Sequence, residues 1–451
     1  MAAQTAPGRL SVFALVSPAL ALAALGPPLT LYLPEYFANH IGLPLGSVGA
    51  AFMWVRLIDI GFDPFLGAVM DCTRTRFGQF RLWLMAGVPL MVVSCGMLYL
   101  AVPGATMAYL IVGLALIYAA QSICHLAQNA WAARLSKSYN ERSRIYAWNQ
   151  AAGVAGMVVL LMLPPLVGQF YPGDRAIGVH TIGWYAIVLM TVTTAIAVAV
   201  VPEPIVQASG TSRETAWTTL SSFAMLIRRP AVARILIADL LLGLNLGLTG
   251  AVFLFYAREV LKLERTQANF AMLIFFSCGL AGVALWMWLA RLVGKHRTLA
   301  CAAAWTAVAQ ALLLLAPPGN FLVTVPGFAL VGVSYSAGAF LLRAMMADAG
   351  DEVRLDLGED RTGMLYALVN STSKVGQALA VGFAFNLLAS IGFVAAEGAH
   401  NGPEAIFGLK LVFVGGSVVL TLAAAAVILG YRLTKRRHDE ILAALAASTL
   451  T

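Results

Sequence analysis

Apolar stretches of about 20 residues follow one another along nearly the whole chain, and this repetition limits the folds that the chain can adopt. A helix needs about 20 apolar residues to cross the hydrocarbon core of a bilayer. Of the 451 residues, 60% are hydrophobic and 11% are charged, whereas soluble domains carry roughly 25% charged residues. Because unpaired backbone groups are costly in lipid, such spans must be helical. The chain is therefore predicted to be an all-α polytopic membrane protein.

Twelve membrane spans are predicted, separated by short polar connections. Arginine and lysine gather in every second connection, as in residues 74–81 and 134–144, and this bias places both termini in the cytoplasm. That orientation requires an even number of spans, which agrees with twelve. The expected spans are 10–37, 46–69, 82–102, 107–133, 145–168, 179–201, 232–257, 266–290, 298–316, 320–343, 363–391 and 406–431.

A longer polar connection divides the spans into two groups of six. Within it, Trp217, Leu220, Phe223 and Ile227 recur at helical spacing, which predicts an amphipathic helix on the inner membrane surface. Two groups of six spans are typical of transporters built from repeats. The expected domains are an N-terminal six-helix bundle at 1–202, a cytoplasmic linker with the amphipathic helix at 203–230, and a C-terminal six-helix bundle with a short cytoplasmic tail at 231–451.

Two aspartates lie one helical turn apart inside the second expected span. Asp59 and Asp63 share a helix face, and Arg56 lies three residues before Asp59 on nearly the same face. An ionisable group at membrane depth costs roughly 3 kcal/mol on insertion scales. The pair predicts a water-accessible cavity in which carboxylates hold a cation or a proton. The alternative is a structural ion pair between Arg56 and Asp59, which does not account for Asp63.

The connection after this span combines glycines, an acid and arginines. Gly67 and Asp71 precede the turn, and Arg74, Gly78 and Arg81 follow. Its pattern resembles the cytoplasmic loop motif of the major facilitator superfamily, in which the acid can pair with basic residues and helix termini and latch one conformation. Plain anchoring of positive charge on the inner side is the alternative.

The second half carries two further groups of charges. The inner connection at 348–361 mixes acids and bases, among them Asp351 and Arg361, and is suited either to switching ion pairs between the halves or to simple solvation. Lys374 lies well inside the eleventh expected span, where a lysine needs a counter-charge or a cavity. Asp59 and Asp63 are its expected partners.

These features together resemble the glycoside–pentoside–hexuronide:cation symporter family (melibiose permease-like) of the major facilitator superfamily. The resemblance rests on the run RLIDIGFDPFLGAVMDCTRTRFGQFR, on the pattern ADAGDEV…R…GMLYALV…K and on the twelve-span layout. It implies the major facilitator fold and a bacterial-type inner (plasma) membrane location. It further implies a monomer that couples transport to Na⁺ or H⁺ without any other cofactor.

The resemblance also implies roles for individual residues. Asp59 and Asp63 match the two aspartates that bind the coupling ion, and they would be the metal ligands if the ion is Na⁺. Ser122 falls where the family often has a hydroxyl near the cation, and Lys374 matches a lysine near the cation and sugar sites. Arg142 matches a basic residue of the loop between spans four and five and joins the latch residues.

The sugar-binding residues of the family are not retained. Leu22 and Ala23 stand where its sugar carriers have a charged pair in the first span. His125, Asn129 and Gln150 fall at or near the positions of an aspartate, a tryptophan and an arginine that contact the sugar. Since specificity for hydroxyl groups needs convergent hydrogen-bonding partners, a simple melibiose-like galactoside is disfavoured.

The coupling site departs from the family at one position. Phe62 replaces the asparagine that lies between the two cation-binding aspartates. The amide oxygen of asparagine is a potential ligand for a hard cation, so its loss favours H⁺ over Na⁺ as the coupling ion.

Candidate substrate contacts come from polar and aromatic residues of the predicted spans. Each one, taken singly, is also open to a role in helix packing. Gly26, Pro27 and Pro28 are expected to break the first span near its middle, and broken helices line binding sites in many transporters. The candidates are Tyr32, Gln121, His125, Gln128, Asn129, Trp131, Gln150 and Asn370.

The predicted function is cation-coupled symport of a small organic solute, a glycoside or related sugar, by alternating access. Two alternatives remain, a cation-coupled carrier of an amphipathic or lysolipid-like substrate and a proton-coupled exporter. An enzyme is disfavoured because the chain has no nucleophile elbow, HExxH motif, P-loop or paired metal ligands. The expected partners are the bilayer and the solute, and not nucleic acid, because the net charge of +8 is spread over loops.

Overall fold

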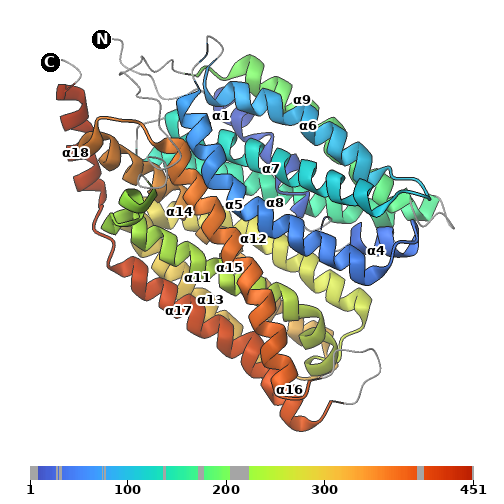
Figure 1. Cartoon of the computed structure of the whole chain (residues 1–451). Coiled ribbons are helices and arrows are strands. Elements are labelled where there is room, and N and C mark those ends of the chain that lie inside the picture. The colour runs from blue at the N-terminus through green and yellow to red at the C-terminus, as the bar shows by residue number, and fades with distance from the viewer. Residues whose placement is uncertain are drawn as a thin grey trace. The chain divides into compact units, whose positions relative to one another are not determined.

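The computed structural model describes residues 9–26, 29, 33–73, 75, 78–135, 139–170, 177–203, 223–393 and 401–448. Every regular element within these ranges is a helix (Figure 1). Eight of the described helices are long and apolar enough to cross a membrane. An all-helical membrane fold is therefore present in this part of the chain, while the number of twelve spans and the side on which the termini lie stay predictions.

Most helix boundaries follow the expected spans within a few residues, but three spans depart from them. The first span is interrupted, and the helix at Tyr139–Phe170 begins six residues before its expected start at 145. The helix at Phe321–Leu357 continues past the expected end at 343, so residues 348–357 of the expected inner connection are helical, and the helix ends before Gly358, whose φ is +71°. In the N-terminal half the helices are α1 (Arg9–Val16), α2 (Ala19–Leu22), α4 (Leu33–Asn39), α5 (Leu45–Cys72), α6 (Phe80–Tyr99), α7 (Met107–Leu135), α8 (Tyr139–Phe170) and α9 (Ile177–Val200). In the C-terminal half they are α11 (Pro230–Phe255), η1 (Tyr256–Val260), α12 (Arg265–Val293), α13 (Lys295–Leu312), η2 (Leu313–Leu315), α14 (Phe321–Leu357), α15 (Thr362–Ser390), α16 (Pro403–Lys410), η3 (Leu411–Gly415), α17 (Gly416–Leu429) and α18 (Lys435–Ser448).

The first span is interrupted earlier than expected. Helix α1 ends at Val16, and Pro18 is the N-cap of the short helix α2, which ends at Leu22. Proline has no amide hydrogen and clashes with a preceding turn, so Pro18 accounts for the first interruption. Pro27 and Pro28, where the break was expected, lie outside the described residues, as does most of the predicted linker helix.

The chain divides into two compact units. The first comprises residues 1–220 together with 353–368, and the second comprises 221–352 and 369–451. The end of α14 and the start of α15 therefore belong with the first unit, although they come from the C-terminal half of the sequence. Each unit is described by itself below.

Small residues allow the helices of the first unit to pack closely. A Cβ at Gly87 of α6 would lie 2.5 Å from Cys124 Sγ of α7, and a Cβ at Gly183 of α9 would lie 2.5 Å from Tyr99 Cβ. Both distances are shorter than a carbon can tolerate, so α6 approaches its two neighbours only because these positions lack a side chain. Close backbone approach at small residues is how membrane helices gain packing energy without a hydrophobic driving force.

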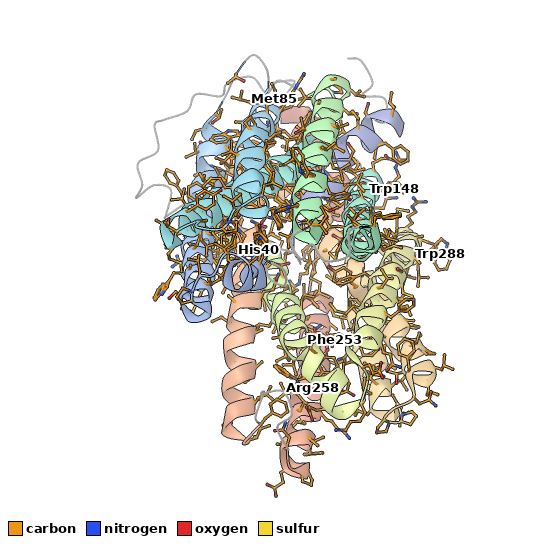
Figure 2. The ribbon with its side chains drawn as sticks, turned by 90° about the vertical axis from the view of Figure 1, so that its right-hand side faces the viewer. His40, Met85, Trp148, Phe253, Arg258 and Trp288 are labelled. Carbon is orange, nitrogen blue, oxygen red and sulfur yellow. The ribbon has the colours of Figure 1, made fainter. Side chains whose placement is uncertain are left out.

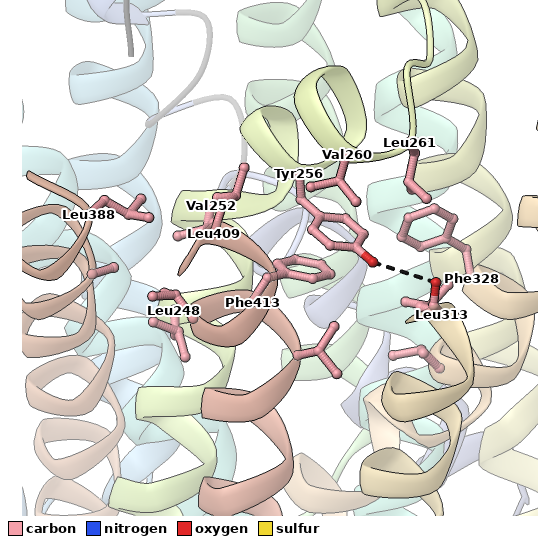
Figure 3. Packing of buried hydrophobic residues seen from close by; sticks show 14 of the residues in the cluster. Leu248, Val252, Tyr256, Val260, Leu261, Leu313, Phe328, Leu388, Leu409 and Phe413 are labelled. Atoms are coloured by element: carbon pink, nitrogen blue, oxygen red, sulfur yellow. Dashed lines mark hydrogen bonds between the residues drawn. The ribbon is translucent and has the colours of Figure 1, made fainter. Parts of the chain in front are cut away.

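The second unit contains a cluster of buried hydrophobic residues around two π-helical turns (Figure 3). Tyr256 of η1 stacks on Phe413 of η3 with ring centroids 4.2 Å apart. The Tyr256 hydroxyl donates to the carbonyl oxygen of Leu313 at 3.5 Å, which satisfies the phenol inside the cluster. The π-turns widen α11 and the α16–α17 helix at the point where the rings stack.

Large hydrophobic side chains also cover the outside of the helices. Met85, Trp148 and Trp288 are three of the exposed ones (Figure 2). Exposed apolar side chains on this scale would aggregate a soluble protein, and they are expected where helices face lipid. The surface therefore agrees with a multi-pass membrane protein.

Candidate functional site

The two aspartates of α5 are buried inside the first unit. Asp59 is 5% exposed and Asp63 is fully buried. Asp59 Oδ1 accepts a hydrogen bond of 2.9 Å from the hydroxyl of Ser122 on α7. Three oxygen-bearing side chains, those of Asp59, Asp63 and Ser122, thus come from two packed helices, while the role of Ser122 at a coupling ion stays a prediction.

Arg56 also contacts this site. Its Nη1 lies 3.3 Å from Asp59 Oδ2, and its guanidinium lies over the ring of Tyr118 at 4.9 Å from the centroid. The ion pair that formed the structural alternative is therefore present, together with the Ser122 hydrogen bond. The Asp59 carboxylate thus contacts a guanidinium and a hydroxyl, and the Asp63 carboxyl lies one turn away. At such a site a bound cation can replace the guanidinium as the positive partner of the carboxylate.

The predicted substrate residues of α7 lie along one face and differ in burial. Gln121, His125 and Asn129 are four residues apart, and the first two are half-buried. Asn129 is buried, and its Oδ1 has no hydrogen-bond donor among the described residues. Gln128 is buried and donates from Nε2 to the carbonyl oxygen of Leu15 at 3.0 Å, so its amide ties α7 to α1.

The aromatic candidate on α7 lies deep inside the unit. Trp131 is fully buried, and its indole N–H has no acceptor within the described part of the chain. Nearby, the Tyr146 hydroxyl donates to the carbonyl oxygen of Asn129 at 2.8 Å and also makes a hydrogen bond with the hydroxyl of Tyr366. This tyrosine pair, which the sequence did not single out, joins α8 to the start of α15.

The remaining candidates are dispersed. Gln150 is half-buried on α8, and Asn370 and Lys374 are half-buried on the part of α15 that belongs to the second unit. Tyr32 lies outside the described residues. The contact expected between Lys374 and the aspartates of α5 stays a prediction.

The acid of the predicted latch caps a helix. Asp71 Oδ1 accepts from the backbone N–H of Gly363 at 2.8 Å, and Oδ2 accepts from that of Met364 at 2.9 Å. Both amides lie in the first turn of α15, where backbone N–H groups have no acceptor within the helix and a negative charge is favoured. Gly67 permits this approach, because a Cβ there would lie 2.6 Å from Ala367 Cβ and 2.8 Å from the carbonyl oxygen of Gly363.

Arg134 connects the same region to a second capped helix. Its Nη2 donates to Asp360 Oδ2 at 2.9 Å and its Nη1 donates to Gln79 Oε1 at 2.8 Å. Glu203 in turn accepts from the backbone N–H groups of Gln79, Phe80 and Arg81 at 2.9–3.0 Å, and so caps α6.

The other predicted latch residues have local roles or lie elsewhere. Gly78 has a φ of +104°, a conformation that glycine adopts without strain.

The charged residues of the predicted latch differ in their contacts. Arg142 is buried and donates to the carbonyl oxygen of Ala133 at 3.3 Å, and Arg361 pairs with Glu359 at 2.6 Å. Arg74 lies outside the described residues. Asp351 belongs to the second unit and lies 3.0 Å from His438 Nε2.

Several of these residues were not recognised from sequence as parts of a network. The sequence pattern indicates only an inner positive charge at Arg134 and the start of the linker at Glu203. One signal is local: Asp360 stands two residues before Thr362, and its Oδ1 accepts from the Thr362 N–H at 3.1 Å as a helix N-cap does. The partners of Arg134 are 55 and 226 residues away, and local patterns do not predict such contacts.

The carboxyl of Asp360 predicts an acid dependence of stability. Burial opposes its ionised form, but the Arg134 guanidinium and the hydrogen bonds from Thr362 hold the pKa of Asp360 below its ordinary value of 3.8. A lowered pKa stabilises the folded state above the unfolded-state pKa, and this contribution is lost as the pH falls through the folded-state pKa.

We therefore expect Asp360→Asn to lower the free energy of unfolding at neutral pH by about 1.5–3 kcal/mol, the usual contribution of a hydrogen bond to a charged group. The difference from the wild type should shrink as the pH falls below 3.8. Thermal unfolding in detergent across this range measures both effects, with Asp439→Asn on the exposed face of α18 as the control. A difference that is constant with pH would contradict the assignment.

Comparisons with known proteins agree with this architecture. The chain is 22% identical over 422 residues to the glucuronide carrier protein homolog of Escherichia coli, covering 91% of this chain and 90% of the relative. It is 23% identical over 421 residues to the isoprimeverose transporter of Lactiplantibacillus pentosus, covering 90% and 84%. The crystal structure of a bacterial homologue of the iron transporter ferroportin in an outward-facing state has a TM-score of 0.66 at 16% identity, covering 94% of this chain and 99% of that one.

A family model described as MFS/sugar transport protein matches residues 14–435, which is nearly the whole chain. Its members are transporters and not enzymes, in agreement with the absence of catalytic motifs from the sequence. The all-helical structure, the lipid-suited surface and this match together show that the chain belongs to the MFS/sugar transport protein family, of the glycoside and hexuronide symporter type.

Proposed function

We propose that this protein is a cation-coupled symporter that carries a glycoside or related sugar across a bacterial-type inner membrane by alternating access. The observation that carries the proposal is the buried pair Asp59 and Asp63 on α5, with Asp59 bound to Ser122 and Arg56. The relatives named as a glucuronide carrier and an isoprimeverose transporter support a sugar as the solute. They do not favour a lysolipid-like substrate or export.

The coupling ion is Na⁺ or H⁺, and the side chains at the site fit either. Carboxylate and hydroxyl oxygens are the ligands of hard cations, and Asp59, Asp63 and Ser122 supply only such oxygens. Either carboxyl can instead take a proton. Phe62, which lies between the two aspartates, adds no oxygen, and this favours H⁺.

Arg56 gives the site a way to respond to the ion. When no cation is bound, the guanidinium is the positive partner of Asp59 at 3.3 Å. A bound cation or proton removes the need for that partner, and Arg56 is then free to pair elsewhere while remaining over Tyr118. Binding of the ion thus changes a local electrostatic contact, which is the differential interaction that a conformational shift requires.

The capped helix α15 is the proposed latch. Asp71 binds the first turn of α15, and Asp360 at the same end binds Arg134. Release of these contacts frees a helix whose later residues, from 369 on, belong to the second unit. We place this latch on the cytoplasmic side, together with both termini, and expect a monomer.

A ligand screen of the purified protein in detergent tests the proposal. We expect a β-glycoside, a xyloside or a uronate to raise the melting temperature, because a ligand at about 100 times its Kd stabilises the native state by about 2.7 kcal/mol. The increase should grow with Na⁺ or at lower pH and disappear in Asp59→Asn. Protection by lysolipids alone, with no response to any sugar, would overturn the proposed substrate class.

A further inference from the structure

The second unit contains a carboxyl group that the proposed coupling site does not use. Asp239 lies on α11, and only 6% of its surface is exposed. Within the described residues, its Oδ2 has no hydrogen-bond donor. An ionised carboxylate is costly to bury without donors, whereas a protonated carboxyl is neutral and tolerates burial far better.

Asp239 shares a helix face with two glycines that bring α15 close. Gly243 and Gly247 lie one and two turns after Asp239. A Cβ at Gly243 would lie 3.0 Å from the carbonyl oxygen of Ser373, and a Cβ at Gly247 would lie 2.6 Å from that of Gln377. Because both contacts advance by four residues on each helix, α11 and α15 run parallel here, and the face with Asp239 packs on the polar stretch of α15.

One positive group, Arg343, acts on this carboxyl and can serve as its partner when it is ionised. Arg343 of α14 acts on Asp239 electrostatically, and its Nη1 donates to the carbonyl oxygen of Ala339 at 2.9 Å. Lys374 follows Ser373 on α15. Helix α17, which also packs on α11, has no ionisable residue, and Arg234 of α11 itself lies beside Gly430.

The environment of Asp239 is therefore compatible with two protonation states of its carboxyl. In one it is a neutral acid, which tolerates burial inside the second unit. In the other it is a carboxylate compensated by Arg343. A group that is stable in both states on a helix face between packed spans can take up and release a proton during a transport cycle, as intramembrane acids do in proton-driven carriers.

We propose that Asp239 is a second proton-binding group of the carrier, located in the C-terminal unit, with Arg343 as its counter-charge. This inference rests on the proposed symport and extends it by assigning a proton to a carboxyl other than Asp59 and Asp63. The step is a proton transfer only. The O–H bond of the Asp239 carboxyl forms with a proton from water and breaks when that proton returns to water.

Infrared difference spectroscopy of the purified protein, recorded between an acidic and an alkaline pH, tests the proton site without any sugar. The wild type should show a protonated-carboxyl C=O band that Asp239→Asn lacks and that the exposed control Asp439→Asn keeps. Asp239→Glu should retain a band at a shifted frequency. A wild-type spectrum whose band is unchanged in both Asp239 variants would overturn the proposal, and the glutamate variant preserves the test if the asparagine variant does not fold.

Proteoliposome assays then separate this proposal from the proposed function. With the sugar identified by the ligand screen, Asp239→Asn should lose at least about tenfold in accumulation driven by a pH gradient while retaining exchange of labelled for unlabelled sugar. Full pH-driven accumulation in Asp239→Asn would overturn the inference and leave symport intact. Failure of the wild type to carry any sugar would instead overturn the proposed function, and the infrared result would still decide the proton site.

Discussion

Asp59→Asn is expected to abolish concentrative uptake of the sugar, with at least about a tenfold loss, equivalent to about 1.4 kcal/mol of coupling. Asparagine has nearly the same size and can still accept the Ser122 hydrogen bond, but it carries no charge and takes no proton. The variant should therefore insert and fold while losing its response to the ion gradient. Uptake into proteoliposomes under an imposed Na⁺ or pH gradient measures the effect.

Two further variants sharpen this test. Asp63→Asn should give the same loss, because Asp63 is fully buried one turn further along the same face. Arg56→Gln should retain ion-dependent binding of the sugar, since the guanidinium is the partner that the ion replaces in the proposed cycle. Full accumulation in both aspartate variants would show that the pair is structural and that the coupling ion binds elsewhere.

Lys295→Met is expected to lower the stability of the second unit by about 3–5 kcal/mol, the usual cost of leaving one partner of a buried ion pair uncompensated. Lys295 Nζ lies 2.5 Å from Asp348 Oδ2, and both side chains are 1% exposed. On the other side of this pair, the fully buried His438 of α18 has its Nε2 3.7 Å from Asp348 Oδ1. The loss should appear as a lower unfolding midpoint in detergent.

The double variant Lys295→Met with Asp348→Leu separates charge from packing. Replacing both members of a buried pair by apolar groups is often neutral or stabilising, so the double variant should recover most of the loss. Arg436→Ala is the matched control, because Arg436 pairs with Glu440 on the exposed side of α18 and surface pairs contribute little. A double variant as unstable as Lys295→Met would show that the lysine acts through its packing and not through its charge.

The parts of this structure that could be predicted are those that local pattern controls. The bounds of α5 and α7 follow from apolar length, and the shared face of Asp59 and Asp63 follows from helical periodicity. The hydrogen bond of Ser122 to Asp59 was not predicted, because no pattern within the sequence relates two residues that are 63 positions apart. The family resemblance implied only a hydroxyl near the coupling ion at this position.

Two features near the ends of the chain were not predicted, the interruption of the first span and the helix that follows the last span. The first span is interrupted at Pro18, a position that the sequence pattern did not single out, because proline has no amide hydrogen and clashes with the preceding turn. The prolines of the expected break at Gly26–Pro28 lie outside the described residues. The chain after residue 434 was expected to be a short tail, but it contains helix α18, whose His438 is buried against Asp351. With 14 residues this helix is too short to cross a membrane, and both His438 and Ile441 are buried.

The sequence by itself determined the membrane class, most of the helix boundaries and the face on which the coupling acids lie, because each depends on hydrophobic length and on the 3.6-residue period of one helix. Only the tertiary structure decided which acidic side chains cap which helices and which basic side chains form ion pairs with the acids. Asp71 meets the amides of Gly363 and Met364, and Arg134 meets Asp360, across more than 200 residues. Such pairings depend on how the helices pack, and packing is a property of the folded chain as a whole.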